Sequence, residues 1–222
     1  MKRNPCTPAI AAIALAGSAH ADVVFSSFGP GDSARLSGFT ISGPDNTFFS
    51  ATGMDIDSAF PFTPSGATFT LDSIEVPAFK IQGDGGNSME FSIHRSAANG
   101  LPGEVLETFK ISDLPSLGPD LPIFTLESST NPLLVEGERY WVSSSTTVSD
   151  GVFSWRASES SLGLEELWAI SFDKKPWRIE DPAREIAAFR VNGTVIPAPG
   201  AAGLVLGSSL LLVQRRRRTL TF

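Results

Sequence analysis

Short apolar runs that alternate with polar residues and end at glycine or proline constrain this chain more than any other feature. From Asp22 to Val195 no stretch carries a long helical period, and the whole sequence holds 20 glycines and 16 prolines. Alternation with a period of two predicts strands, and helix breakers at this density separate them by turns. We therefore expect an all-β fold: a single antiparallel β-sandwich of jelly-roll type, in which two sheets bury their apolar faces against each other.

Three segments carry the strand pattern most clearly. The run MEFSIHR places Met89, Phe91 and Ile93 on an inner face and His94 on the outer one. The run ATFTLDSIEV changes parity at Asp72-Ser73, which predicts a β-bulge. In EVLETFKI a polar residue, glutamate, shares its parity with the apolar residues that follow it.

Later segments are less uniform. RYWVSSSTT and GVFSWRAS flank VSDG, a turn sequence that predicts a β-hairpin. Their tryptophans, Trp141 and Trp155, are expected in the core. Residues 160–170 fit one or two helical turns, although a strand over 167–172 fits equally well. Residues 187–195 predict a final strand.

The charge of the chain is unevenly distributed. Six of the 17 basic residues lie at the two ends, as Lys2, Arg3 and Arg215–Arg218, so that the region between them carries a net charge of −13. Such a region repels phosphate backbones, and we expect no nucleic-acid partner. The acidity suits an extracytoplasmic body or weak binding of hard cations.

Residues 1–21 carry the three parts of a secretory signal peptide. A basic start (MKR) precedes a short apolar stretch, Ala9–Ala16, and the small residues Ala19 and Ala21 suit signal peptidase. The stretch is too short to span a bilayer. We expect cleavage before Asp22. The only cysteine, which lies in this segment, would leave with it, so the mature chain would have neither disulfide nor thiol chemistry.

Residues 196–222 predict a C-terminal membrane tail. Pro197 and Pro199 precede an apolar run, Ala201–Val213, whose 13 residues would reach about 20 Å as a helix, short of the ~30 Å hydrocarbon core. The cluster Arg215–Arg218 resists crossing, which keeps it cytoplasmic and holds the body outside. A marginal span with a proline junction and a basic stop suggests a segment that is processed in the membrane.

The order of prolines, short apolar helix and arginine cluster resembles the PEP-CTERM sorting signal of bacterial envelope proteins. Its junction is occupied by Pro197, Ala198 and Pro199, with alanine where the family usually has glutamate. The resemblance implies export, arrest in the inner membrane and removal of the tail by an exosortase. Residues 39–195 are similar to the choice-of-anchor ectodomains that precede such anchors, on MEFSIHRSAANGLPGEVLETFKI, LLVEGERYWVSSS and GVFSWRAS.

The sequence contains few candidate catalytic residues. His94 is the one histidine outside the signal peptide, and no G-x-S-x-G motif accompanies it, so we expect a solvated or structural histidine rather than a triad member. One histidine without cysteine cannot build the usual zinc sites. Two neighbouring carboxylate pairs could be imagined in a glycosidase, but neighbours in sequence rarely face each other across a cleft; they are Glu165 with Glu166 and Glu180 with Asp181.

Two groups of oxygen ligands are candidates for Ca²⁺. Asp55 and Asp57 share a parity, and Asp84 and Asn87 lie on a glycine-rich loop. Turn geometry alone also favours Asp and Asn at such positions, and neither group matches a twelve-residue calcium loop. We expect no other cofactor.

Trp168 and Trp177 are candidates for an exposed aromatic platform that stacks on sugars, with partial burial at a sheet edge as the alternative. The sequence therefore predicts an exported, non-enzymatic protein of the bacterial cell surface or extracellular matrix, which its tail first holds in the inner membrane. Exopolysaccharide is its candidate partner after release. A carbohydrate-binding module is the alternative, and a glycoside-acting enzyme comes third.

Overall fold

The computed structural model describes residues 21–48, 53–118, 122–159, 168–180 and 185–197. Within these ranges the fold is all-β and antiparallel, as predicted, and one 3-10 turn, η1 (Pro30–Asp32), is the only helical element. None of the described residues form a helix with the length and apolar character that a membrane crossing needs. The predicted signal peptide, except Ala21, and the apolar part of the tail lie outside the described residues.

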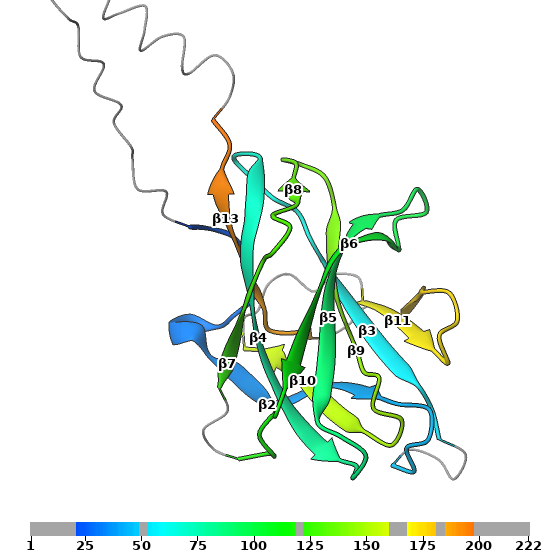
Figure 1. Cartoon of the computed structure of the whole chain (residues 1–222). Coiled ribbons are helices and arrows are strands. Elements are labelled where there is room, and N and C mark those ends of the chain that lie inside the picture. Colours follow the sequence, from blue (N-terminus) through cyan, green and yellow to red (C-terminus); the bar gives the residue numbers. More distant parts are fainter. Residues whose placement is uncertain (1–20, 49–52, 119–121, 160–167, 181–184, 198–222) are drawn as a thin grey trace, which may run out of the picture.

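The strands join edge to edge into one curled sheet (Figure 1). In chain order they are β1 (Asp22–Ser26), β2 (Ala34–Ser42), β3 (Ile56–Phe62), β4 (Phe69–Gln82), β5 (Ser88–Ser96), β6 (Pro102–Ser112), β7 (Ile123–Glu127), β8 (Leu133–Leu134), β9 (Tyr140–Ser145), β10 (Val152–Ser158), β11 (Trp168–Phe172), β12 (Arg178–Glu180) and β13 (Arg190–Val195).

The sheet has the order β1-β13-β4-β10-β2-β3-β9-β5-β6. The long strand β4 pairs with β13 through its first half and with β10 through its second, while β7 and β8 lie along its other side. A branch leaves the path at β3, whose edge carries β11 and then β12. This branch forms the hairpin on which the candidate site is built.

The curl of the sheet encloses a core centred on Trp155 of β10. Its indole ring meets Phe60 of β3 at a centroid distance of 5.3 Å, Phe91 of β5 at 5.2 Å and Phe189 at 5.8 Å. These partners come from distant parts of the strand order, so the apolar faces of those parts pack on one another. Edge-on contacts between such rings stabilise a core beyond the area they bury.

The alternating pattern of β5 and the irregularity in β4 are both confirmed. Met89, Phe91 and Ile93 are fully buried. The register between β13 and β4 passes from Ser73 to Leu71, which leaves Asp72 as the extra residue of a bulge. The break in the alternation of the sequence indicated this bulge, because the extra residue turns the side chains that follow it to the other face of the sheet.

The predicted hairpin between residues 139–147 and 151–158 is wrong. β9 pairs with β3 and β5, whereas β10 pairs with β2 and β4. The turn between them carries the chain from one region of the sheet to another. Turn chemistry fixes only the local change of direction, and both strands here find longer partners elsewhere. Trp141 and Trp155 are nevertheless both fully buried, as expected.

Tyr140 fixes the turn that enters β9. Its phenolic oxygen accepts a hydrogen bond from the backbone nitrogen of Val135 at 2.9 Å and lies 3.1 Å from the carboxylate of Glu138. The ring is fully buried against Phe62, with centroids 5.7 Å apart. A tyrosine that bonds backbone a few residues upstream of its strand has the arrangement of the tyrosine corner.

Candidate binding pocket at the β11–β12 hairpin

The hairpin β11–β12 is held to the edge of β3 by backbone pairing that runs from Ala169, opposite Ala59, to Phe172, opposite Ile56. The strand alternative for residues 167–172 is therefore correct over the described part. The turn that follows contains two residues with positive φ, Asp173 at 53° and Lys174 at 56°. Non-glycine residues rarely adopt this conformation, so the surrounding contacts must hold the turn in place.

An ion cluster supplies those contacts. The ammonium of Lys174 lies 2.9 Å from Asp57 and 3.1 Å from Asp55, and both carboxylates are buried. The backbone nitrogen of Asp173 donates to the carbonyl oxygen of Asp55 at 2.9 Å. The structure thus brings the two predicted calcium ligands together, but it places a lysine ammonium between them as their cation.

Burial and pairing act in opposite directions on these groups. Burial raises the pKa of Asp57, and the hydrogen bond and charge of Lys174 offset only part of this rise. For Lys174, burial favours the neutral amine, but the hydrogen bonds and charges of Asp57 and Asp55 outweigh it and raise the pKa. The lysine therefore stays charged at neutral pH, beside the two buried aspartates.

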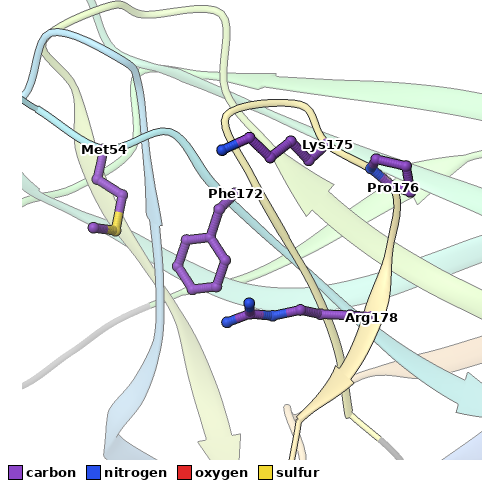
Figure 2. A pocket seen from close by; sticks show the side chains of 5 residues that line it. All are labelled: Met54, Phe172, Lys175, Pro176 and Arg178. Carbon is purple, nitrogen blue, oxygen red and sulfur yellow. The ribbon is translucent and has the colours of Figure 1, made fainter.

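A pocket of about 440 Å³ is lined in part by Met54 and Lys175, the sequence neighbours of Asp55 and Lys174 (Figure 2). Its lining is almost wholly apolar and comes from the segment before β3, the end of β11, the turn and the start of β12. The lining residues are Met54, Phe172, Lys175, Pro176 and Arg178. Figure 2 shows the Phe172 ring between Met54 and Arg178. The guanidinium carbon of Arg178 stands 4.7 Å from the centre of that ring, a cation–π contact.

Both cations at the pocket rim already have an acidic partner. Arg178 pairs with Glu180 at 2.7 Å and Lys175 with Asp173 at 3.3 Å. The pocket therefore combines an aromatic wall with hydrogen-bond donors and carries little net charge. Volumes of about 300–1,000 Å³ with apolar walls and a few polar groups are typical of small-molecule sites.

Trp177 does not line this pocket and packs against the sheet. It packs against the cluster of Ala59, Trp141 and Ala169, and its ring meets that of His94 edge-on with centroids 6.3 Å apart. Trp168 packs on Phe39, with centroids 5.3 Å apart, and both tryptophans are partly buried. The structure thus places them against the sheet, as the edge-burial alternative expected.

The outward placement of His94 is wrong, because the side chain is only 6% exposed. The prediction took the second face of β5 to be open to solvent, but Trp177 lies over it at this point. Nδ1 of His94 lies 3.2 Å from the carbonyl oxygen of Gly103, and Nε2 lies 2.7 Å from Oγ of Ser143. A carbonyl only accepts, so Nδ1 carries the proton and the Ser143 hydroxyl donates to Nε2.

This geometry supports a structural role for His94. Burial lowers the pKa of the imidazole more than the hydrogen bond to Gly103 raises it, so the ring is neutral at pH 7. Its orienting partner is a carbonyl, where a catalytic triad has a carboxylate. The pair of His94 and Ser143 links β5 to β9 beneath the hairpin.

The second pair of calcium candidates lies elsewhere, on the β4–β5 loop. Asn87 bridges to Leu114: its amide nitrogen donates to the Leu114 carbonyl at 2.8 Å and its oxygen accepts from the Leu114 nitrogen at 3.1 Å. The backbone nitrogens of Asp84 and Gly85 donate to the carboxylate of Asp150 at 2.7 and 3.0 Å. These bonds lower the pKa of Asp150. Asn87 therefore joins the β4–β5 loop to the segment that follows β6.

No group of three or more histidine, aspartate or glutamate side chains among the described residues is arranged to hold a metal ion. Of the imagined glycosidase pairs, Glu180 is described and pairs with Arg178. Of the processing sites, Ala21 and Pro197 are described and exposed. The other candidates lie outside the described residues: Ala19, Glu165, Glu166, Asp181, Ala198, Pro199, Arg215, Arg216, Arg217 and Arg218.

Glu107 is an anchoring residue to which the sequence argument gave no role. Its carboxylate is buried and accepts hydrogen bonds from the hydroxyl of Ser128 at 2.5 Å and from the backbone nitrogens of Ser129 and Thr130 at 2.6 and 3.2 Å. Burial raises the pKa of Glu107, but the hydrogen bonds together lower it by a larger amount. The net shift of the pKa is therefore downward. A glutamate on the buried parity of a strand was the available signal.

Comparison of the chain with protein-family models, with curated proteins and with solved structures finds no match.

Proposed function

We propose that this chain is an exported, non-enzymatic protein of the bacterial cell surface or extracellular matrix. Its body is a β-sandwich ectodomain of jelly-roll type, and its C-terminal tail first holds it in the inner membrane and is then processed by an exosortase. The proposal draws on the resemblance of residues 1–21 to a signal peptide and of the tail to the PEP-CTERM signal.

One structural relationship supports it most. β1 begins at Asp22, β13 ends at Val195, and the two strands pair with Asp22 opposite Gly193 (Figure 1). The two ends of the folded body therefore lie side by side at one end of the sheet. Both proposed cleavage points therefore lie outside the core, because cleavage at either point removes no residue that is paired in the sheet.

The mass of the mature protein tests both cuts at once. We expect a product that begins at Asp22 and ends near Pro199. A second test replaces Arg215–Arg218 by serine and compares membrane fractions. The matched control replaces Lys110 and Arg139, two exposed cations of the body. Loss of membrane retention in the first variant alone supports the tail, and equal membrane fractions contradict it.

A carbohydrate-binding module is the second candidate function. The observation that favours it is the apolar pocket at the β11–β12 hairpin, with the Phe172 ring in its wall and donors at its rim. If the processed and released protein binds no glycan, the carbohydrate-binding proposal is contradicted. The surface-protein proposal is unaffected by that result.

A further inference from the structure

We propose that the pocket of the β11–β12 hairpin binds a neutral hexopyranosyl unit of an extracellular polysaccharide. This inference rests on the proposed extracellular function and deepens it by naming the site and the ligand class. It differs from the sequence expectation, which looked to Trp168 and Trp177 for the aromatic surface.

The walls of the pocket suit a ligand with one apolar face. Met54, Phe172 and Pro176 form them, and the cavity of about 440 Å³ lies within the range of small-molecule sites. A pyranose ring presents its C–H groups on its faces, and these carry the partial positive charge that the negative face of an aromatic ring attracts. The guanidinium of Arg178 lies over the Phe172 ring, and Met54 and Pro176 complete the apolar surface that the ligand would contact.

The charges around the pocket favour a neutral ligand over an anionic one. Lys175 and Arg178 are paired with Asp173 and Glu180, and Lys174 stands between two buried carboxylates. Three cations thus face four carboxylates. A uronate or sulfated sugar would have to displace an internal acid and would approach a body that is itself strongly acidic.

The rim still offers hydrogen-bond donors to hydroxyl groups. A guanidinium carries five N–H groups, and an ammonium carries three. The side chains of Arg178 and Lys175 are 62% and 72% exposed and pair mainly with one carboxylate each. Their remaining N–H groups can donate to sugar oxygens above the apolar floor.

The pocket is also preformed. The ion cluster of Lys174 with Asp55 and Asp57 fixes the turn, and the hydroxyl of Ser171 donates to the carbonyl of Lys175 at 2.7 Å. A ligand that enters a wall already in place does not have to order it, which saves part of the entropy that binding costs.

The experiment uses the full-length chain in a detergent without a sugar headgroup, because maltosides and glucosides would compete. Saturation-transfer NMR and calorimetry measure binding of tetrasaccharides of glucose, mannose and galactose, with a glucuronate tetrasaccharide and p-cresol as comparison probes. We expect a neutral tetrasaccharide to bind with a Kd of the order of 1 mM, which is about 4 kcal/mol. Phe172→Leu and Met54→Ala should each weaken it about fivefold or more.

Phe124→Leu is the matched control, since Phe124 is a partly buried phenylalanine on β7 that packs on the core away from the pocket. Thermal unfolding of each variant separates loss of binding from loss of fold, and Met54→Ala serves where Phe172→Leu unfolds. The inference is overturned if no neutral tetrasaccharide binds, if the glucuronate binds as tightly, if only p-cresol binds, or if the control weakens binding equally. The mature mass is unaffected by any of these results, so it tests the proposed function separately.

Discussion

Lys174 and Asp57 form an ion pair that joins the turn of the β11–β12 hairpin to the start of β3, with Nζ 2.9 Å from Oδ1. The aspartate is buried while about half of the lysine side chain is exposed to solvent. The pair therefore lies at the boundary between core and surface, where one partner is desolvated and the other is not. Removing the lysine would leave a buried carboxylate without its cation, whereas removing the aspartate would leave an ammonium that solvent already reaches.

Replacing Lys174 by methionine should lower the free energy of unfolding by about 1–3 kcal/mol. The change keeps an unbranched side chain, one atom shorter, but leaves two buried carboxylates without their cation. Exposure of the lysine reduces the cost below that of a fully buried pair. Urea unfolding measures it. Lys175→Met, which breaks a pair whose side chains are 72% and 54% exposed, is the control and should cost less than about 0.5 kcal/mol. Equal losses would show that the cluster does not hold the turn.

Glu107 should make the protein sensitive to acid. Its pKa in the folded chain lies below that of the unfolded chain, so its contribution is complete above the unfolded pKa of about 4.3 and is lost as pH falls through the folded value. Glu107→Gln should therefore lower the free energy of unfolding at pH 7 by about 1–3 kcal/mol. Between pH 5 and pH 3, the free energy of unfolding of the variant should fall less than that of the parent. Unfolding free energies at the three pH values test this. If the stability of the variant depends on pH as steeply as that of the parent, other carboxylates cause the sensitivity to acid.

His94 should produce a second pH effect, at higher pH. Its folded pKa is lowered, so above the unfolded pKa of about 6.5 the ring is neutral in both states and stability does not depend on it. As pH falls below that value, only the unfolded chain takes up the proton, and stability falls by up to about 1.4 kcal/mol per pH unit until the folded pKa is reached. His94→Gln should remove this slope between pH 6.5 and 5.5. Chemical unfolding at these pH values measures it, and an unchanged slope contradicts the burial of the ring.

Tyr140→Phe should cost about 1–3 kcal/mol, because it leaves the backbone nitrogen of Val135 without the acceptor that lies 2.9 Å away. The ring itself stays in the core. Thr108→Val is the comparison, since it removes an exposed hydroxyl that lies 2.8 Å from Oγ of Ser92, and it should change stability by less than about 0.5 kcal/mol. Thermal unfolding followed by tryptophan fluorescence reports both. A Tyr140→Phe protein as stable as the parent would show that water replaces the phenol at the turn.

The strands of this molecule were predictable because their signal is local. The alternation in Met89, Phe91 and Ile93 and the broken parity at Asp72 each follow from the pleat of a single strand. The pairing of strands was not predictable in the same way. β9 and β10 are neighbours in sequence, but the partners that each finds lie far away along the chain.

The candidate site escaped prediction for a related reason. Met54 and Phe172 are more than a hundred residues apart, and only the pairing of β11 with β3 brings them together. The burial of His94 depends on Trp177 in the same way. Asp55 and Asp57 were correctly placed near each other, but their partner Lys174 comes from a turn whose position the sequence leaves open.

The position of β13 between β1 and β4 also determines how the body would bear mechanical load. For a body tethered through its tail, a pull enters at Val195 and runs along β13, parallel to the strand. The hydrogen bonds on both flanks then resist in shear and must fail together, whereas a pull across the strand would open them one by one. A protein held in this way would withstand drag from flowing liquid without a covalent cross-link.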